Sequence, residues 1–235
     1  MDPRSPAAHR TILVLDVEGF GSHNRTNKNQ LAVRHGLREA WQEAFDKAGI
    51  TRAKCAVEDR GDGIFLLAPA EMPKAQFVDA VPLHLAAALR AHNAVHPREE
   101  QIRLRMALHA GEVEFDDTGA TGAAILHAFR LLNSRTLREA LGRSSGVLAL
   151  ITSDWFYHEV VKQSGVVNPA DFREVRVSVK ETNAVAWITL PDQVTSPGRL
   201  APWPSPSRFQ PLLRGLKASR TLTAARTTFR RSGQS

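Results

Sequence analysis

The sequence predicts an α+β domain in which strands and helices follow a βαββαβ order, with two helices on one face of a sheet. An apolar, β-branched run over 11–15 is typical of a strand buried on both faces. Apolar positions at helical spacing over 30–47 indicate an amphipathic helix. A Gly-Asp-Gly at 61–63, between the apolar runs 53–57 and 64–68, indicates a tight β-hairpin.

The next segments complete this order. Apolar residues over 73–94 predict a second helix, which Pro82 should kink or divide. The run 102–110 predicts a strand that continues over 111–115 as an arm ending in a turn. Strand, helix, hairpin, helix and strand in this order form the ferredoxin-like plan.

Further elements are expected after this plan. A helix is predicted over 122–141 and a buried strand over 146–151. Asp154 is the predicted N-cap of a short helix, and two closing strands follow at 172–179 and 184–190. The predicted domain, 8–190, therefore has extra C-terminal strands and a helix.

The composition separates this domain from a Pro-rich, basic tail at 191–235. The tail holds six of the 13 prolines, eight of the 31 Lys and Arg residues and one of the 24 acidic residues, which leaves 23 residues of each sign in 1–190. Because the domain is formally neutral, nucleic acid is not its expected partner. For the tail, disorder and binding to RNA, DNA or an anionic membrane all stay open.

A single cysteine, Cys55, excludes an internal disulfide and a cysteine zinc cluster, and we expect a small buried thiol. Neither a signal peptide nor a membrane-spanning stretch is visible, so a cytoplasmic protein is expected.

Two aspartates carry the chemistry. Asp16 ends the first strand and Asp62 lies at the hairpin tip. In the predicted plan the hairpin's second strand runs antiparallel beside the first strand, which brings both carboxylates to one edge. Such a pair favours a bound Mg²⁺ or Mn²⁺, although both aspartates could instead simply finish strands. Glycines at the same edge would let backbone amides face phosphate oxygens: Gly19, Gly21, Gly61 and Gly63.

Three blocks resemble the class III nucleotidyl cyclases, over residues 11 to about 135. They are Leu15-Asp16-Val17-Glu18-Gly19-Phe20, Arg60-Gly61-Asp62-Gly63, and the stretch from Arg105 to Val113. The resemblance implies that Asp16, Asp62 and the Val17 carbonyl hold two divalent ions, Mn²⁺ or Mg²⁺. It also implies that the loop from Glu18 to Gly21, with Phe20, contacts the triphosphate.

This family completes its site across a head-to-tail homodimer, with an Asn and, four positions later, an Arg on the helix after the third block. Arg130 matches the Arg and would stabilise charge on the transferring phosphate. Leu126 stands in place of the Asn, where His127 or another group could act instead. His109 is expected to be a packed histidine rather than a metal ligand.

Substrate choice is expected to depart from adenine. Glu58 stands where adenylyl cyclases carry a purine-reading lysine, and Gly119 stands near their adenine-reading aspartate. The pyrimidine cyclases of bacterial anti-phage signalling depart similarly, and resemblance to them implies cyclic UMP or cyclic CMP as product, with UMP favoured. Arg60 could contact phosphate or base, or be a solvated turn residue; Arg103 and Arg105 share a strand face and could make similar contacts.

The resemblance implies attack of a ribose 3′-hydroxyl on the α-phosphate with pyrophosphate leaving, and Asp16, Asp62 and Arg130 as the catalytic residues. A second hypothesis is a catalytically silent nucleotide-binding or dimerisation module, which Leu126 favours. A third is nucleic-acid binding through the tail.

Overall fold

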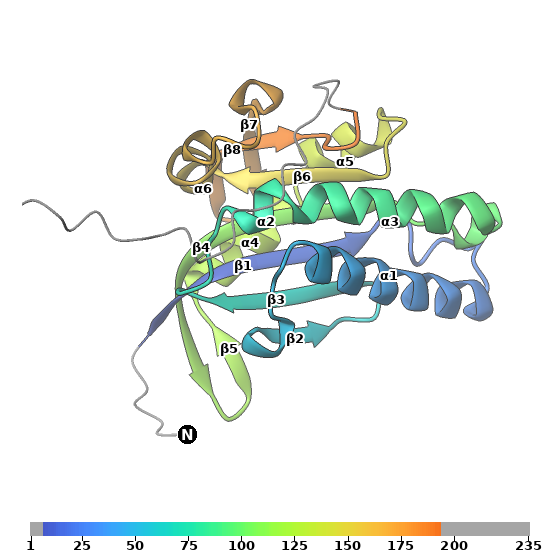
Figure 1. Ribbon diagram of the computed structural model, residues 1–235, viewed down its shortest axis with the longest axis horizontal. Helices are drawn as coiled ribbons and strands as arrows, with labels where there is room; N and C mark the ends of the chain where they lie inside the picture. The colour runs from blue at the N-terminus through green and yellow to red at the C-terminus, as the bar shows by residue number, and fades with distance from the viewer. Residues whose placement is uncertain (1–6, 194–235) are drawn as a thin grey trace, which may run out of the picture. The chain divides into compact units, whose positions relative to one another are not determined.

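The computed structural model describes residues 7–193, which form a mixed sheet with helices on both faces (Figure 1). Apart from 191–193, the predicted tail lies outside the described residues. The strand order is β2-β3-β1-β4-β6-β8-β7, and β5 pairs with β4 alone. The strands are β1 (Ala8–Val17), β2 (Ala56–Asp59), β3 (Gly63–Pro69), β4 (Leu104–Asp116), β5 (Gly119–Thr121), β6 (Leu148–Ser153), β7 (Arg173–Val179) and β8 (Thr182–Thr189).

The α+β prediction and the βαββαβ plan are confirmed. β1 lies between β3 and β4 and is antiparallel to both, with β2 outside β3. The C-terminal strands extend this unit: β6 is parallel to β4, and β8 and β7 follow as antiparallel neighbours. Beyond the sheet, β4 continues as an arm paired with β5 (Figure 1).

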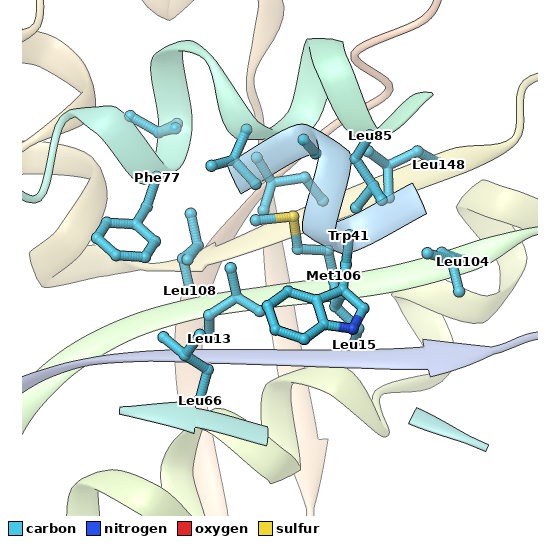
Figure 2. Close-up of a cluster of buried hydrophobic side chains, with 14 of the residues drawn as sticks. Leu13, Leu15, Trp41, Leu66, Phe77, Leu85, Leu104, Met106, Leu108 and Leu148 are labelled. Atoms are coloured by element: carbon cyan, nitrogen blue, oxygen red, sulfur yellow. The ribbon is translucent and has the colours of Figure 1, made fainter. Parts of the chain in front are cut away.

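One face of the sheet is covered by α1 (Asn27–Lys47), α2 (Gln76–Asp79) and α3 (Val81–Val95). We call it the α1/α3 face. The helices and strands bury a large apolar cluster between them (Figure 2), which includes Leu13, Leu15, Trp41, Leu66, Phe77, Leu85, Met106 and Leu108. Burying such side chains is the main stabilising contribution to a fold of this kind.

The opposite face, which we call the α4/α5 face, packs against α4 (Ala123–Leu132) and α5 (Arg135–Gly142). A second cluster forms there around Ile12, Val14 and Ala107. Because side chains alternate along a strand, Asp16 and Arg105 belong to this face. All four residues of β2, at the sheet edge, are exposed.

Several local predictions are corrected. The helix expected over 122–141 is two helices, because the Ser134 side chain caps α5. The predicted N-cap Asp154 is wrong. The hydroxyl of Ser153 accepts from the Phe156 amide at 3.2 Å and caps α6 (Asp154–Glu159), whereas the Asp154 carboxylate accepts from the Trp187 indole at 2.9 Å.

The segment before the hairpin also differs. Residues Arg52–Lys54 form a 3₁₀ turn, so β2 begins only at Ala56, and Cys55 is half-buried rather than buried. The division at Pro82 is confirmed, since α2 ends at Asp79 and Pro82 lies in the first turn of α3. Within residues 7–193, no helix is long and apolar enough to cross a bilayer.

Candidate active site

The hairpin tip lies against the end of β1, which places Asp62 beside Asp16. Asp16 is opposite Gly63 in the β1–β3 register, and the Val17 amide donates to the Asp62 carbonyl at 2.9 Å. A Cβ on Gly63 would lie 2.2 Å from the Leu15 carbonyl oxygen, so only glycine permits this approach. The sequence-based expectation that the two aspartates meet at one edge therefore matches the observed backbone.

Asp16 lies in a charged environment. Burial raises the pKa of its carboxyl, the Arg105 guanidinium lowers it, and the negative charge of Asp62 raises it. Arg105 is opposite Asp16 in the β1–β4 register and forms an ion pair with it. With side chains only 13% and 21% exposed, this pair is largely shielded from solvent. The two carboxylates thus influence one another, and one cation already compensates part of their charge.

The loop after β1 is held from both sides. Gly19 has φ +63, and its carbonyl accepts from the Ser22 amide at 3.1 Å, which closes a turn. Phe20 packs against the cluster of the α1/α3 face. Glu18 pairs with Arg103 at 2.8 Å, and Arg103 also donates to the Gly146 carbonyl at 3.1 Å. Arg103 therefore holds the loop in place, whereas Arg105 reaches a site carboxylate.

Glu58 and Arg60 border the same edge. The Arg60 guanidinium lies 5.3 Å from the centre of the Phe129 ring, and its Nη1 is 3.5 Å from a Glu58 carboxylate oxygen. Phe129 packs on Phe65 with ring centres 5.4 Å apart. Glu58 is opposite Phe65 in the β2–β3 register, so it shares the α4/α5 face. Arg60 thus has a defined aromatic contact in addition to its exposure to solvent.

Arg130 takes a different position. From α4, its Nη1 donates to the Thr182 hydroxyl at 2.9 Å and its Nη2 pairs with Glu181, at the β7–β8 turn. In the described residues it makes no hydrogen bond or ion pair with Asp16 or Asp62. A role for Arg130 at these carboxylates would have to come from a second copy of the chain, as the resemblance implies.

The residues near the missing Asn are also placed. Leu126 is 56% exposed on α4. His127 faces the sheet, where its ring centre is 4.8 Å from that of His109. Burial lowers the pKa of His109 to about 4, and its Nδ1 is 2.7 Å from the Ser153 hydroxyl oxygen. His109 is therefore a packed histidine, as expected, and nothing here favours His127 as a replacement for the Asn.

Oxygen donors at this edge suit a hard divalent cation. Asp16 and Asp62 would supply carboxylates and Val17 its carbonyl. No group of three or more His, Cys, Asp or Glu side chains in the described part of the chain is arranged as a metal site. The fit therefore depends on the two carboxylates, and the pKa of Asp16 is raised by burial first and then by the negative charge of Asp62.

Comparisons with known proteins support the fold. No protein-family model matches the sequence, and no curated protein matches it. Solved structures do match. An adenylate/guanylate cyclase/hydrolase from Silicibacter pomeroyi aligns with a TM-score of 0.56 and 22% identity, over 80% of this chain and 99% of that one. The guanylyl cyclase Cya2 aligns with a TM-score of 0.54 and 17% identity, over 81% and 96%.

A third structure, the guanylate cyclase domain of RhGC from Catenaria anguillulae in complex with GTP, aligns with a TM-score of 0.51 and 16% identity, over 79% and 99%. These likenesses show that residues 7–193 have the fold of class III adenylate and guanylate cyclases. At these identities the comparison concerns the fold, and the roles of individual residues stay predictions.

Three contacts were not anticipated from the sequence. Phe129 underlies Arg60, and Glu181 and Thr182 hold Arg130. The turn over 180–183 was predicted only as a turn, because nothing in its composition marks a partner for an arginine 52 positions earlier. The Gly-Asp-Gly tip, by contrast, carried its own local signal.

Proposed function

We propose that the protein is a nucleotidyl cyclase that converts a ribonucleoside triphosphate into its 3′,5′-cyclic monophosphate and pyrophosphate. The observation that carries the proposal is the meeting of Asp16 and Asp62 at one sheet edge, in the fold of the adenylate and guanylate cyclases. The proposed role of each site residue rests on its position at this edge and on the resemblance of its motif.

Divalent ions, Mn²⁺ or Mg²⁺, would be held by Asp16, Asp62 and the Val17 carbonyl; when bound they supply positive charge that polarises phosphate oxygens and favours the ionised hydroxyl. Asp16 and Asp62 would fix where these ions lie at the sheet edge. The loop carrying Gly19, Phe20 and Gly21 would present backbone amides to the triphosphate, which the left-handed backbone of Gly19 makes possible. Arg105, which pairs with Asp16, is placed to compensate part of the negative charge of the carboxylates.

Arg130 completes the proposed site from a second subunit. Within its own chain it contacts Glu181 and Thr182, so a head-to-tail homodimer is the arrangement that would bring it to a partner's carboxylates. There its planar guanidinium would stabilise charge on the transferring phosphate.

For the base, we propose a pyrimidine, with UTP or CTP as substrate. Its support is the departure from the adenylyl pattern at Glu58 and Gly119 and the resemblance to the pyrimidine branch. A second messenger role in anti-phage defence would follow by analogy with that branch.

Guanine is a second candidate for a specific reason. The half-exposed Glu58 carboxylate only accepts hydrogen bonds, and guanine offers adjacent imino and amino donors that match both oxygens. Cytosine offers one amino group and uracil one imino group between two carbonyls, so each satisfies a carboxylate less completely. Two of the similar structures are described as guanylyl or guanylate cyclases.

The experiment is to incubate the full-length protein with each of the four ribonucleoside triphosphates and Mn²⁺, and to detect cyclic products by mass spectrometry. Asp16→Ala and Asp62→Ala should each reduce the rate by about 10³-fold, because each removes several kcal/mol of transition-state stabilisation. Asp46→Asn, a charge change on the exposed side of α1, is the matched control and should leave the rate unchanged. If no triphosphate is cyclised, the silent-module hypothesis replaces this proposal.

The homodimer has its own test. A mixture of Asp16→Ala chains with Arg130→Ala chains forms heterodimers with one intact site, so about a quarter of the wild-type rate should return if subunits exchange at random. A mixture as inactive as either variant, at concentrations where the chains are dimeric, would contradict the shared site.

A further inference from the structure

The β7–β8 turn holds Arg130 through two contacts of different character. The Thr182 hydroxyl accepts from Nη1 at 2.9 Å, and Thr182 is buried, with 8% of its surface exposed. The Glu181 carboxylate pairs with Nη2, and its side chain is 76% exposed. One guanidinium nitrogen is therefore fixed by a buried hydroxyl, and the other meets a solvated carboxylate.

The backbone fixes both partners. Thr182 is the first residue of β8 and lies opposite Val179 of β7, so its position follows from the strand register. The turn between them contains Lys180 at φ 51, the one non-glycine residue with positive φ in the described residues. A residue other than glycine in this left-handed region marks a constrained turn, and such turns are enriched at functional sites.

The free energy needed to break each contact should differ between Glu181 and Thr182. An ion pair to an exposed carboxylate is weak in net terms, because water solvates both charges when it opens. A hydrogen bond to a buried hydroxyl is costlier to break, because the hydroxyl would lose its partner away from solvent. A competing anion would therefore displace Glu181 before Thr182.

We propose that Thr182 is a positioning residue for Arg130, and that the Glu181 carboxylate holds the place that a substrate phosphate takes on Nη2. This rests on the proposed cyclase function. Carboxylate and phosphate oxygens are alternative acceptors for the same guanidinium geometry, so the exchange requires no movement of Arg130 away from Thr182. Glu181 then keeps Arg130 extended and charge-compensated until substrate arrives.

The proposal predicts opposite effects from neighbouring residues. Glu181→Gln removes the competing charge and should lower the KM of the cyclised triphosphate by about twofold to fivefold, with kcat unchanged. Thr182→Val removes the hydroxyl at constant shape and should lower kcat by about threefold to tenfold, with a smaller effect on KM. Thr182→Ser keeps a hydroxyl and should restore most of the rate.

The matched control is Glu174→Gln, which removes an exposed negative charge from the neighbouring strand β7 and should change neither constant. Thermal midpoints are measured for every variant, since a purely structural contact would shift stability without separating kcat from KM. If Thr182→Val does not fold, the Glu181→Gln and Thr182→Ser results still decide.

Outcomes separate this inference from the proposed function. An active wild-type protein whose Glu181→Gln variant has an unchanged or raised KM overturns the placeholder role. An active protein whose Thr182→Val variant keeps its kcat overturns the positioning role. A wild-type protein that cyclises no triphosphate, in a preparation shown to be folded, overturns the proposed function and with it this inference.

Discussion

The two faces of the sheet contrast in chemistry although the same strands build both. On the α1/α3 face, β1 and β4 contribute a mostly apolar layer that includes Leu13, Leu15 and Met106, all at most 2% exposed. On the α4/α5 face the same two strands carry Asp16 and Arg105. His109 lies on this face too, four residues after Arg105 on β4. Both faces bury apolar residues, but the charged groups of the candidate site lie only on the α4/α5 face.

This contrast shows how one strand serves both purposes. Alternation places Leu15 in the core and its neighbour Asp16 on the opposite face, so the close-packed Leu15 fixes the backbone that carries the catalytic candidate. Apolar substitutions on the α1/α3 face should therefore lower stability and leave the chemistry unchanged, whereas substitutions of the charged groups on the α4/α5 face should change the chemistry.

The largest expected effect tests the α1/α3 face. Leu66 on β3 is fully buried, and Leu66→Ala should reduce the free energy of unfolding by about 2–5 kcal/mol, because it removes apolar contacts and leaves a cavity. Urea denaturation measures this loss. The cyclase rate per folded molecule should stay at the wild-type value, and a fall in that rate at full folding would show that the faces are not separable.

A buried carboxylate at the end of α2, on the same side of the sheet, predicts a pH effect. Asp79 is 3% exposed, one carboxylate oxygen accepts from the Ser164 hydroxyl at 2.6 Å, and the other has no partner. Burial raises its pKa to about 6 from 3.8, so the folded state holds this proton more tightly than the unfolded state. Its contribution to stability is full below about pH 4 and is lost as the pH rises through 6.

Asp79→Asn removes this loss. The variant should match the wild type near pH 4 and exceed its free energy of unfolding by up to about 3 kcal/mol at pH 7.5. Thermal midpoints across pH measure the difference. Asp117→Asn, at an exposed turn position, should show no such divergence, and an Asp79→Asn variant less stable than the wild type at pH 7.5 would refute the assignment.

The sequence predicted one half of the candidate site better than the other. Asp16 and Asp62 were placed by local signals, a buried strand and a Gly-Asp-Gly turn, combined with a plan whose antiparallel pairing brings them together. The partners of Arg130 depend on how α4 lies against the turn before β8, which no local pattern specifies. Ser153 and Asp154 show a smaller limit, since adjacent residues with the same capping chemistry cannot be ranked from composition.

On the α4/α5 face, Arg105→Gln should expose the repulsion between the carboxylates. Without this cation the pKa of Asp16 would rise further, because burial and Asp62 both raise it, and stability at neutral pH should fall by about 2 kcal/mol. Mn²⁺ should raise the thermal midpoint of the variant more than that of the wild type, since a bound cation replaces the lost charge. The double variant Asp16→Asn/Arg105→Gln should lose this Mn²⁺ response; retention would place the metal elsewhere.

The smallest change in stability is expected at Arg60. Arg60→Gln removes a half-exposed contact with Phe129 and a 3.5 Å ion pair with Glu58, together worth about 1 kcal/mol or less. Substrate binding, measured as KM, should change more than stability. Loss of Arg60 removes a positive charge next to Asp62, at the position where Arg60 could contact phosphate or base, so KM should rise by about threefold to tenfold in steady-state assays. Arg176→Gln, at an exposed position of β7, is the control. An unchanged KM for Arg60→Gln would make Arg60 a solvated turn residue without a role in substrate binding.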